Sequence, residues 1–279
     1  MEISTQSKLS EDVFRLLRDF IYDYCGIFFD GDSRFLLEKK LSGRIDKLQI
    51  RNFREYYHFL RYDKGSGEEL NSIIDILTTN ETYFFRESQQ LKAFSEEILH
   101  EIRDKKNMEK TLRIWSAGCS TGEEPYTIAI LIIESERFAD WDVEIFANDI
   151  SRRALNIAMN GVYKRSSFRS TNKFYIDKYF KEENGRLRII DKVKEIVNFR
   201  YLNLMDKWKI NLLTTMDIIF CRNVIIYFGH EARKGLIESF NKKIEDGGYL
   251  LLGHAESLIN ISTAFTLRHL KNDIVYQKG

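Results

Sequence analysis

Apolar side chains recur every three or four positions through the first 80 residues, which is the spacing of amphipathic helices. Gly-containing breaks at 26–33 and 63–67 interrupt this pattern. The pattern therefore predicts an all-helical N-terminal domain over residues 1–78. Its expected helices run from about Ser10 to Cys25, 35 to 48, 52 to 61 and 68 to 77.

The pattern changes near residue 112, where short apolar runs begin to alternate with helical segments. The expected strands cover 112–115, 143–147, 217–220 and 248–253. The expected helices cover 125–135, 151–159 and 231–244. Strands that alternate with helices favour a mostly parallel, doubly wound sheet, so the fold class is α/β and Rossmann-like.

The alternation fails between residues 179 and 203. Asn184-Gly185 is a turn signal, and 187–190 and 196–201 are short strand candidates. We interpret this stretch as a small antiparallel β subdomain at 179–201, inserted in a domain that spans 112–279. Residues 79–111 are expected to form a linker and a connecting helix.

Composition removes several classes of protein. The chain has 279 residues, 43% of them hydrophobic, and a net charge of +1, which excludes a disordered chain. Cys25, Cys119 and Cys221 form no CxxC pair, which argues against a disulfide framework or a zinc site. There is no apolar run long enough for a membrane span, and Met1–Gln6 shows no secretory pattern. We expect a cytoplasmic protein.

The balanced total hides a basic segment. Residues 34–61 carry eight basic and three acidic side chains. At helical spacing these basic groups can share one face. That face is either ordinary solvated surface or a docking surface for an acidic partner, with Arg44, Lys47 and Arg51 as candidates. The overall charge balance and the lack of an aromatic-basic RNA motif disfavour nucleic acid.

The strand at 112–115 leads into a glycine-containing loop, Gly118–Gly122, that opens a helix. Glycines allow a tight turn and close approach to a ligand, and the carboxyl end of such a strand is where cofactors bind. The loop is not GxGxxG. Glu123 and Glu124 would repel a phosphate but suit a cation, such as the ammonium or sulfonium of S-adenosylmethionine. The alternative is that both only favour the helix dipole.

Asp149 follows the next expected strand by two residues and lies 31 residues after Gly118. An acidic residue there can hydrogen-bond ribose hydroxyls. Asp before Ser is also a common helix start, so this signal supports the loop rather than standing alone.

Six short stretches, in order and spacing, give the chain a resemblance along nearly its full length. It resembles the CheR family of chemotaxis-receptor protein-glutamate methyltransferases. The stretches are Thr79–Glu87, Gly118–Tyr126 with its GEEPY ending, Ala147–Ile150, Asn203-Leu204, Phe220–Phe228 and Gly253–Ser257.

The resemblance implies S-adenosylmethionine as methyl donor, S-adenosylhomocysteine as product, and a set of site residues. The first group, which would close over the cofactor, is Asn80, Thr82 and Arg86. In the second group, Glu124 would contact the amino-acid end of the cofactor and Asp149 the ribose. Asn203 and Leu204 would flank the adenine, and Arg222 and Asn223 would lie on the remaining side. Arg86 and Tyr227 would position the substrate.

The chemistry implied by the resemblance needs no general base. A glutamate carboxylate, with a reference pKa of about 4.3, is already ionised near neutral pH, so none of the five histidines need be catalytic. Catalysis then depends on positioning and desolvation. Arg86 can hold one carboxylate oxygen, and the phenol of Tyr227 can donate one hydrogen bond.

The expected partner is the cytoplasmic helical region of methyl-accepting chemotaxis receptors, whose acidic residues would suit the basic segment. Family members that tether to a receptor C-terminal pentapeptide carry a longer loop in the insert than the connection 181–186 here. We therefore expect a pentapeptide-independent enzyme. Separately, we expect a monomer that does not insert into membranes.

Three other readings stay open at this point. The chain could be an S-adenosylmethionine-dependent enzyme for another substrate class, although it has no Asn-Pro-Pro-Tyr type motif for base methylation. It could be a cofactor-binding signalling adaptor without turnover. An NAD-dependent oxidoreductase is disfavoured by Glu123, Glu124 and the missing GxGxxG.

Overall fold

The computed structural model describes residues 8–279, so the Met1–Gln6 stretch lies outside the described residues. The chain divides into two compact units. The N-terminal unit comprises the chain up to Thr79 together with Tyr227–Ala232. The sheet unit comprises Asn80–Ile226 and Arg233–Gly279.

Helices build the N-terminal unit, and they begin and end within about two residues of the expected positions. Asn52 caps one of them by accepting a hydrogen bond from the Glu55 N–H, as an Asn before an apolar run should. The elements are α1 (Glu11–Cys25), a 3₁₀ turn η1 (Gly31–Ser33), α2 (Arg34–Leu48), α3 (Phe53–Tyr62) and α4 (Ser66–Leu77).

A buried ionic cluster joins α2, α3 and α4. The Glu69 carboxylate is only 4% exposed and accepts hydrogen bonds from the Arg44 guanidinium and the Tyr56 hydroxyl. A buried charge needs such partners because its desolvation is costly. Arg44 is therefore committed inside the N-terminal unit, whereas Lys47 and Arg51 are exposed.

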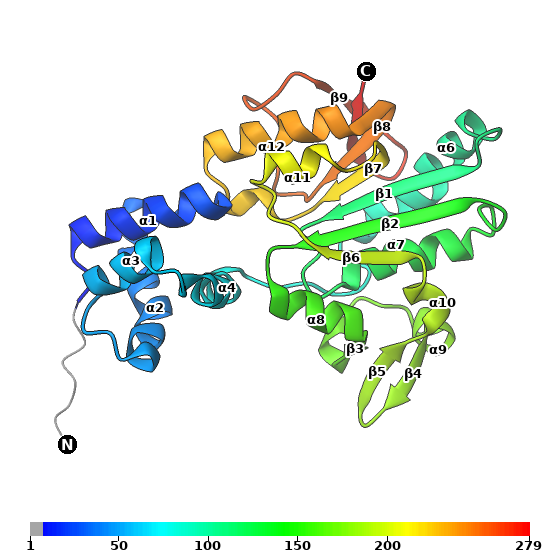
Figure 1. The fold of residues 1–279 in the computed structure, drawn as a ribbon. Helices are drawn as coiled ribbons and strands as arrows, with labels where there is room; N and C mark the ends of the chain where they lie inside the picture. The colour runs from blue at the N-terminus through cyan, green and yellow to red at the C-terminus, as the bar shows by residue number, and fades with distance from the viewer. Residues whose placement is uncertain (1–7) are drawn as a thin grey trace. The chain divides into compact units, whose positions relative to one another are not determined.

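The sheet unit contains a seven-stranded sheet in the order β6-β2-β1-β7-β8-β10-β9 (Figure 1). The first five strands run parallel and β10 is antiparallel to both of its neighbours, so the expected mostly parallel sheet is confirmed. The strands are β1 (Thr111–Ala117), β2 (Asp142–Asp149), β6 (Val197–Tyr201), β7 (Met216–Cys221), β8 (Ile244–Leu252), β9 (Phe265–His269) and β10 (Ile274–Lys278).

Helices cover both faces of this sheet. Phe220 of β7 packs edge-on against Phe94 at 5.2 Å, and Trp115 of β1 packs against Phe240 at 5.1 Å. Trp115 pairs with Ile219, the neighbour of Phe220, so the two aromatic contacts lie on opposite faces. The helical elements are α5 (Ser88–Ala93), a π-helical turn η2 (Phe94–Ile98), α6 (Leu99–Lys105), α7 (Glu123–Glu134), α8 (Arg152–Asn160), η3 (Arg165–Phe168), α9 (Lys173–Tyr179), α10 (Asp191–Lys194), α11 (Lys207–Asn211), η4 (Ile225–Tyr227) and α12 (His230–Lys243).

The segment after Thr79 does more than connect. Phe84 and Phe94 are fully buried and belong to the main core of the sheet unit. The Phe84 ring lies 4.9 Å from that of Phe168 and 5.0 Å from that of Phe180. The stretch expected as linker and connecting helix is thus packed into the sheet unit from Asn80 onward.

The insert is a three-stranded antiparallel sheet of β3 (Val162–Tyr163), β5 (Arg186–Ile189) and β4 (Phe180–Glu183), visible below the main sheet in Figure 1. The Asn184-Gly185 turn is confirmed, with left-handed φ values of 50° and 74°. Most of the connection expected at 181–186 is strand, because the turn itself has only these two residues.

One strand candidate of the insert was placed wrongly. Residues 196–201 lie in the main sheet as β6, parallel to β2, and not in the insert. The turn precedes β5, so β5 pairs with the strand before it, and α10 then carries the chain back to the main sheet. Phe199 packs there against Tyr126 of α7 at 5.4 Å.

Candidate cofactor and active site

Four neighbouring parallel strands end at one edge of the main sheet. In the order β6, β2, β1 and β7, they lead into the segments expected to hold the cofactor. The strand order reverses at β1, and ligands of doubly wound sheets bind at such a reversal. The topology therefore brings together segments that are distant in the sequence, namely Asn203-Leu204, Asp149, Gly118–Gly122 and Arg222-Asn223.

The β1–α7 loop has a shape that only glycine supports at two positions. Gly118 and Gly122 have φ values of +78° and +93°, in the left-handed region. A Cβ on Gly118 would lie 2.6 Å from Val224 Cγ2, and one on Gly122 would lie 2.7 Å from Ala158 Cβ. The backbone of the loop is thereby held close to the elements around it.

Asp149 fixes this loop. Its carboxylate is 7% exposed and accepts hydrogen bonds from the backbone N–H of Ser120 and of Ser151, both at 2.8 Å. The Ser120 hydroxyl in turn donates to Asn80 Oδ1 at 3.3 Å. The structure thus connects Asn80, the glycine loop and Asp149, while the expected contact between Asp149 and a ribose stays a prediction.

The two adjacent glutamates have different surroundings. Glu123 is 2% exposed and accepts a hydrogen bond from the Thr121 hydroxyl at 2.6 Å. Glu124 accepts from the Ser116 hydroxyl at 2.7 Å and lies 3.4 Å from Arg222 Nη1. Glu124 thus contacts a residue that follows another strand, Arg222, whereas the Glu123 carboxylate accepts from Thr121 of its own loop. The expectation that the two glutamates attract a cation stays a prediction.

Arg222, directly after β7, is the centre of a buried network. Its side chain is 3% exposed, and its Nη2 lies 3.0 Å from Glu87 Oε2 and 2.5 Å from the Arg86 carbonyl oxygen. Together with Glu124 this gives two carboxylates around one guanidinium. Arg222 thereby ties the Asn80–Glu87 segment and the glycine-loop helix to the end of β7.

The electrostatics of this edge favour a cation. Burial raises the pKa of Glu124, and the negative charges of Glu87 and Glu256 raise it further, whereas Arg222 opposes the shift. The carboxylates at this edge, Asp149 included, outnumber the guanidinium of Arg222. Such a site would repel the pyrophosphate of NAD and attract a sulfonium or an ammonium.

The residues present fit S-adenosylmethionine. Asn223 Oδ1 is buried and has no hydrogen-bond partner among the described residues, so it can accept from a ligand donor. Glu124, Asp149 and Asn223 would hold the cofactor beside the glycine loop. The cofactor supplies an electrophilic methyl group when it is bound.

Other expected residues lie near this edge with partners of their own. The Arg86 guanidinium donates to the Glu81 carbonyl at 2.8 Å, and Asn203 Oδ1 accepts from the Met205 N–H at 2.9 Å. Leu204 is buried and Thr82 is half-buried. Tyr227 belongs to the N-terminal unit, so its pairing with Arg86 stays a prediction.

Two residues of this edge received no role from the sequence, Glu87 and Glu256. Glu87 binds Arg222, and Glu256 accepts backbone hydrogen bonds from the loop after β7. Both lie in stretches that carry the family resemblance. Glu87 directly precedes α5, and Glu256 lies in the turn after β8, four residues beyond Leu252, so neither directly follows a strand.

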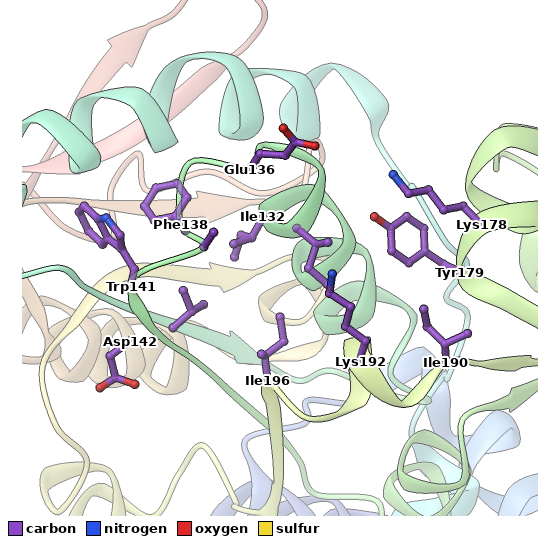
Figure 2. Close-up of a pocket in the computed structure, with 13 residues that line it drawn as sticks. Ile132, Glu136, Phe138, Trp141, Asp142, Lys178, Tyr179, Ile190, Lys192 and Ile196 are labelled. Carbon is purple, nitrogen blue, oxygen red and sulfur yellow. The ribbon is translucent and has the colours of Figure 1, made fainter.

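A separate cavity of about 810 Å³ lies around the C-terminal end of α7 (Figure 2). Lys178 and Tyr179 are on one side of it in the figure, and Phe138 and Trp141 are on the other. It also includes Asp142, the first residue of β2, so it is at the edge opposite the cofactor loops. None of its lining residues was assigned a functional role from the sequence.

Comparison with known proteins decides the family. The protein-family model described as "CheR methyltransferase, SAM binding domain" matches residues 80–274. A second family model, "CheR methyltransferase, all-alpha domain", matches residues 12–78. The chain belongs to the CheR methyltransferase family. It is an S-adenosylmethionine-dependent methyltransferase, and the NAD-dependent reading is thereby excluded.

Similar proteins cover most of this chain. "Chemotaxis protein methyltransferase 2" of Vibrio cholerae is 38% identical over 97% of this chain and 94% of its own length. "Chemotaxis protein methyltransferase" of Borreliella burgdorferi is 37% identical over 90% and 89%. That of Salmonella typhimurium is 30% identical over 96% and 91%. The chain thus takes part in S-adenosylmethionine-dependent methylation in chemotaxis.

Within residues 8–279, no helix has both the length and the apolar character needed to cross a membrane.

Proposed function

We propose that this enzyme transfers the methyl group of S-adenosylmethionine to glutamate side-chain carboxylates of chemotaxis receptors, which gives glutamate methyl esters. The names of the relatives support a role in chemotaxis, and a receptor glutamate as the methyl acceptor is what we propose. The observation that carries it is the acidic edge of four strand ends, which suits a cationic methyl donor.

A carboxylate acceptor suits this site chemically. An ionised carboxylate attacks the methyl group without proton transfer, and its charge cancels that of the sulfonium as the transfer proceeds. The enzyme then has to align the two groups and exclude water. We propose that Arg86 holds the non-attacking oxygen, because among the described residues the Glu81 carbonyl is the hydrogen-bond partner of its guanidinium, which leaves further N–H donors. Tyr227 would orient the same carboxylate with its hydroxyl.

The cofactor roles follow the strand ends. Glu124 would bind the amino-acid end of the cofactor, Asp149 would bind the ribose, and Asn223 would lie on the remaining side. Asn203 and Leu204 would flank the adenine. The remaining proposed contacts come from Asn80, Thr82, Arg86 and Arg222.

Receptor docking is proposed for the basic face of α2 and the residues after it. Lys47 and Arg51 are exposed and would meet acidic receptor helices, with an affinity that falls as salt rises. Arg44, expected as a third docking residue, is paired with Glu69 of α4. It would support the docking face by holding α2 against α4 rather than by contacting the receptor. We also propose that the enzyme needs no receptor C-terminal pentapeptide, because its β4–β5 turn is only Asn184-Gly185. We further propose that it is a cytoplasmic monomer.

The test is methyl transfer from methyl-labelled S-adenosylmethionine to receptor-containing membranes, followed by mild base. The proposal expects label on the receptor that is released as methanol, as a carboxyl methyl ester requires. Membranes without receptor are the control. Base-stable label, or label on another class of molecule, would overturn the glutamate assignment.

A further inference from the structure

The turn after β8 places one carboxylate against the loop after β7. Glu256 Oε2 accepts the backbone N–H groups of Gly253 and Asn223, both at 2.7 Å. Its Oε1 accepts those of Val224 at 2.8 Å and Ile226 at 3.2 Å. One side chain thus collects four backbone N–H groups, three of them from the β7 loop.

The loop that Glu256 holds makes a tight turn at Asn223, an asparagine in the left-handed region that this residue type adopts more readily than most. Asn223 has a left-handed φ of 59°. A Cβ on Gly253 would lie 2.9 Å from Asn223 N, so the two turns are in close contact. The four backbone N–H donors favour the ionised form of the Glu256 carboxyl group, and hydrogen bonds to an ionised acceptor are strong enough to hold these turns together.

The same loop carries groups that belong to the cofactor site. Asn223 presents the buried acceptor oxygen without a partner among the described residues. Val224 packs so closely on Gly118 that no side chain fits there. The position of the β7 loop therefore determines both an expected cofactor contact and one wall of the glycine loop.

We propose that Glu256 is a positioning residue of the cofactor site. Its carboxylate fixes Asn223, Val224 and Ile226 through their backbone N–H groups, and thereby sets where Asn223 meets the cofactor. The inference rests on the proposed contact between Asn223 and the cofactor. A glutamine cannot replace the carboxylate, because its NH₂ group would face backbone N–H donors.

The chain offers a matched control in Glu97. This glutamate likewise accepts the backbone N–H groups of Lys271 at 2.7 Å and Asn272 at 3.1 Å. They belong to the β9–β10 loop, which carries none of the expected cofactor residues. Glu97→Gln therefore removes the same kind of interaction from the sheet unit and leaves the β7 loop alone.

The experiment is calorimetric titration of S-adenosylhomocysteine into the full-length wild type, Glu256→Gln and Glu97→Gln, with thermal melts of each. We expect Glu256→Gln to weaken binding by about tenfold or more, as loss of charge-assisted hydrogen bonds should, and Glu97→Gln to stay within about twofold. Both variants lower the melting temperature.

Equal affinities for wild type and Glu256→Gln would overturn the inference, and so would equal weakening in both variants, which indicates general destabilisation. If Glu256→Gln does not fold, Glu256→Asp, which keeps the charge but is one methylene shorter, is read by the same criteria. Because S-adenosylhomocysteine binding requires no receptor, a failure of receptor methylation would not be confused with a failure of this inference.

Discussion

Each unit of this enzyme holds an arginine against a buried or nearly buried glutamate, and the two clusters differ in charge. In the N-terminal unit, Arg44 is bound by Glu69, which the Tyr56 hydroxyl also contacts. In the sheet unit, Arg222 is bound by Glu87 and Glu124. One cluster pairs one positive charge with one negative charge, and the other pairs one with two.

We interpret the difference as that between a structural cluster and a candidate functional one. The Arg44 cluster joins three helices, α2, α3 and α4, and its positive and negative charges are equal in number. The Arg222 cluster lies where parallel strands end, and it keeps an excess of negative charge beside the glycine loop. An excess of buried negative charge is unfavourable for folding and favourable for a cationic ligand. Substitutions in the two clusters should therefore have different consequences.

The largest effect is expected for Arg222→Met. It leaves Glu87 and Glu124 without their guanidinium in a buried position, which costs about 3–5 kcal/mol of unfolding free energy. It also releases the Asn80–Glu87 segment from β7, so S-adenosylhomocysteine binding should be lost. Urea unfolding and calorimetry check both effects, with Arg153→Met on the exposed surface of α8 as the control. Wild-type affinity in Arg222→Met would contradict the assignment.

Arg44→Met should have the next largest effect, on stability alone. Removing Arg44 leaves the Glu69 charge buried, at a cost of about 3 kcal/mol, with the Tyr56 hydroxyl as remaining partner. Hydrogen exchange should quicken in α2–α4, while S-adenosylhomocysteine affinity stays unchanged. The matched control is Lys47→Met on the exposed face of α2. Loss of cofactor binding in Arg44→Met alone would break the comparison.

A smaller effect is expected from the protonation of Glu124. Because burial raises its pKa, the carboxyl becomes neutral at a higher pH than an exposed glutamate, and its attraction for the ammonium of the cofactor is lost there. Affinity should therefore fall as the pH drops through this raised pKa. In Glu124→Gln the affinity for S-adenosylhomocysteine should be about tenfold lower than in the wild type at neutral pH, and it should depend less on pH. Calorimetry from pH 5 to 8 measures this, and parallel curves for both proteins would contradict it.

The smallest effect concerns glycines. Gly43 is exposed within α2, and a Cβ there would meet nothing within 4 Å, so Gly43→Ala should stabilise by about 0.5–1 kcal/mol. Gly122→Ala, with its left-handed φ and close contact to Ala158, should destabilise instead. Chemical unfolding of both variants checks the signs, and a neutral Gly122→Ala would show that the loop can move.

The sequence predicted elements with strong periodicity well. The helix expected from Ser10 to Cys25 is α1 (Glu11–Cys25), and the strand expected at 217–220 is β7 (Met216–Cys221). Strands β9 and β10 were missed because polar and exposed residues interrupt their short apolar runs. The candidate at 196–201 shows the other limit, since a short run does not tell which sheet it joins.

The site was predictable as far as strand ends could be recognised. Glycine loops and acids at strand ends are local signals, so Gly118, Glu124 and Asp149 could be found from the residues themselves. Partnerships are not local: Arg222 and Glu87 are 135 residues apart, and Arg44 and Glu69 are 25 apart. Charge counts along the chain therefore could not show that Arg44 is paired with the buried Glu69.

The central claim is that the cofactor occupies the carboxyl edge of β6, β2, β1 and β7. Amide hydrogen exchange of the whole protein, with and without saturating S-adenosylhomocysteine, tests it most directly. The account predicts slower exchange in residues 118–124, 149–151, 203–205 and 222–226, with α2 and α3 unchanged. Calorimetrically proven binding without protection of these segments, or with protection confined to the cavity of Figure 2, would contradict it.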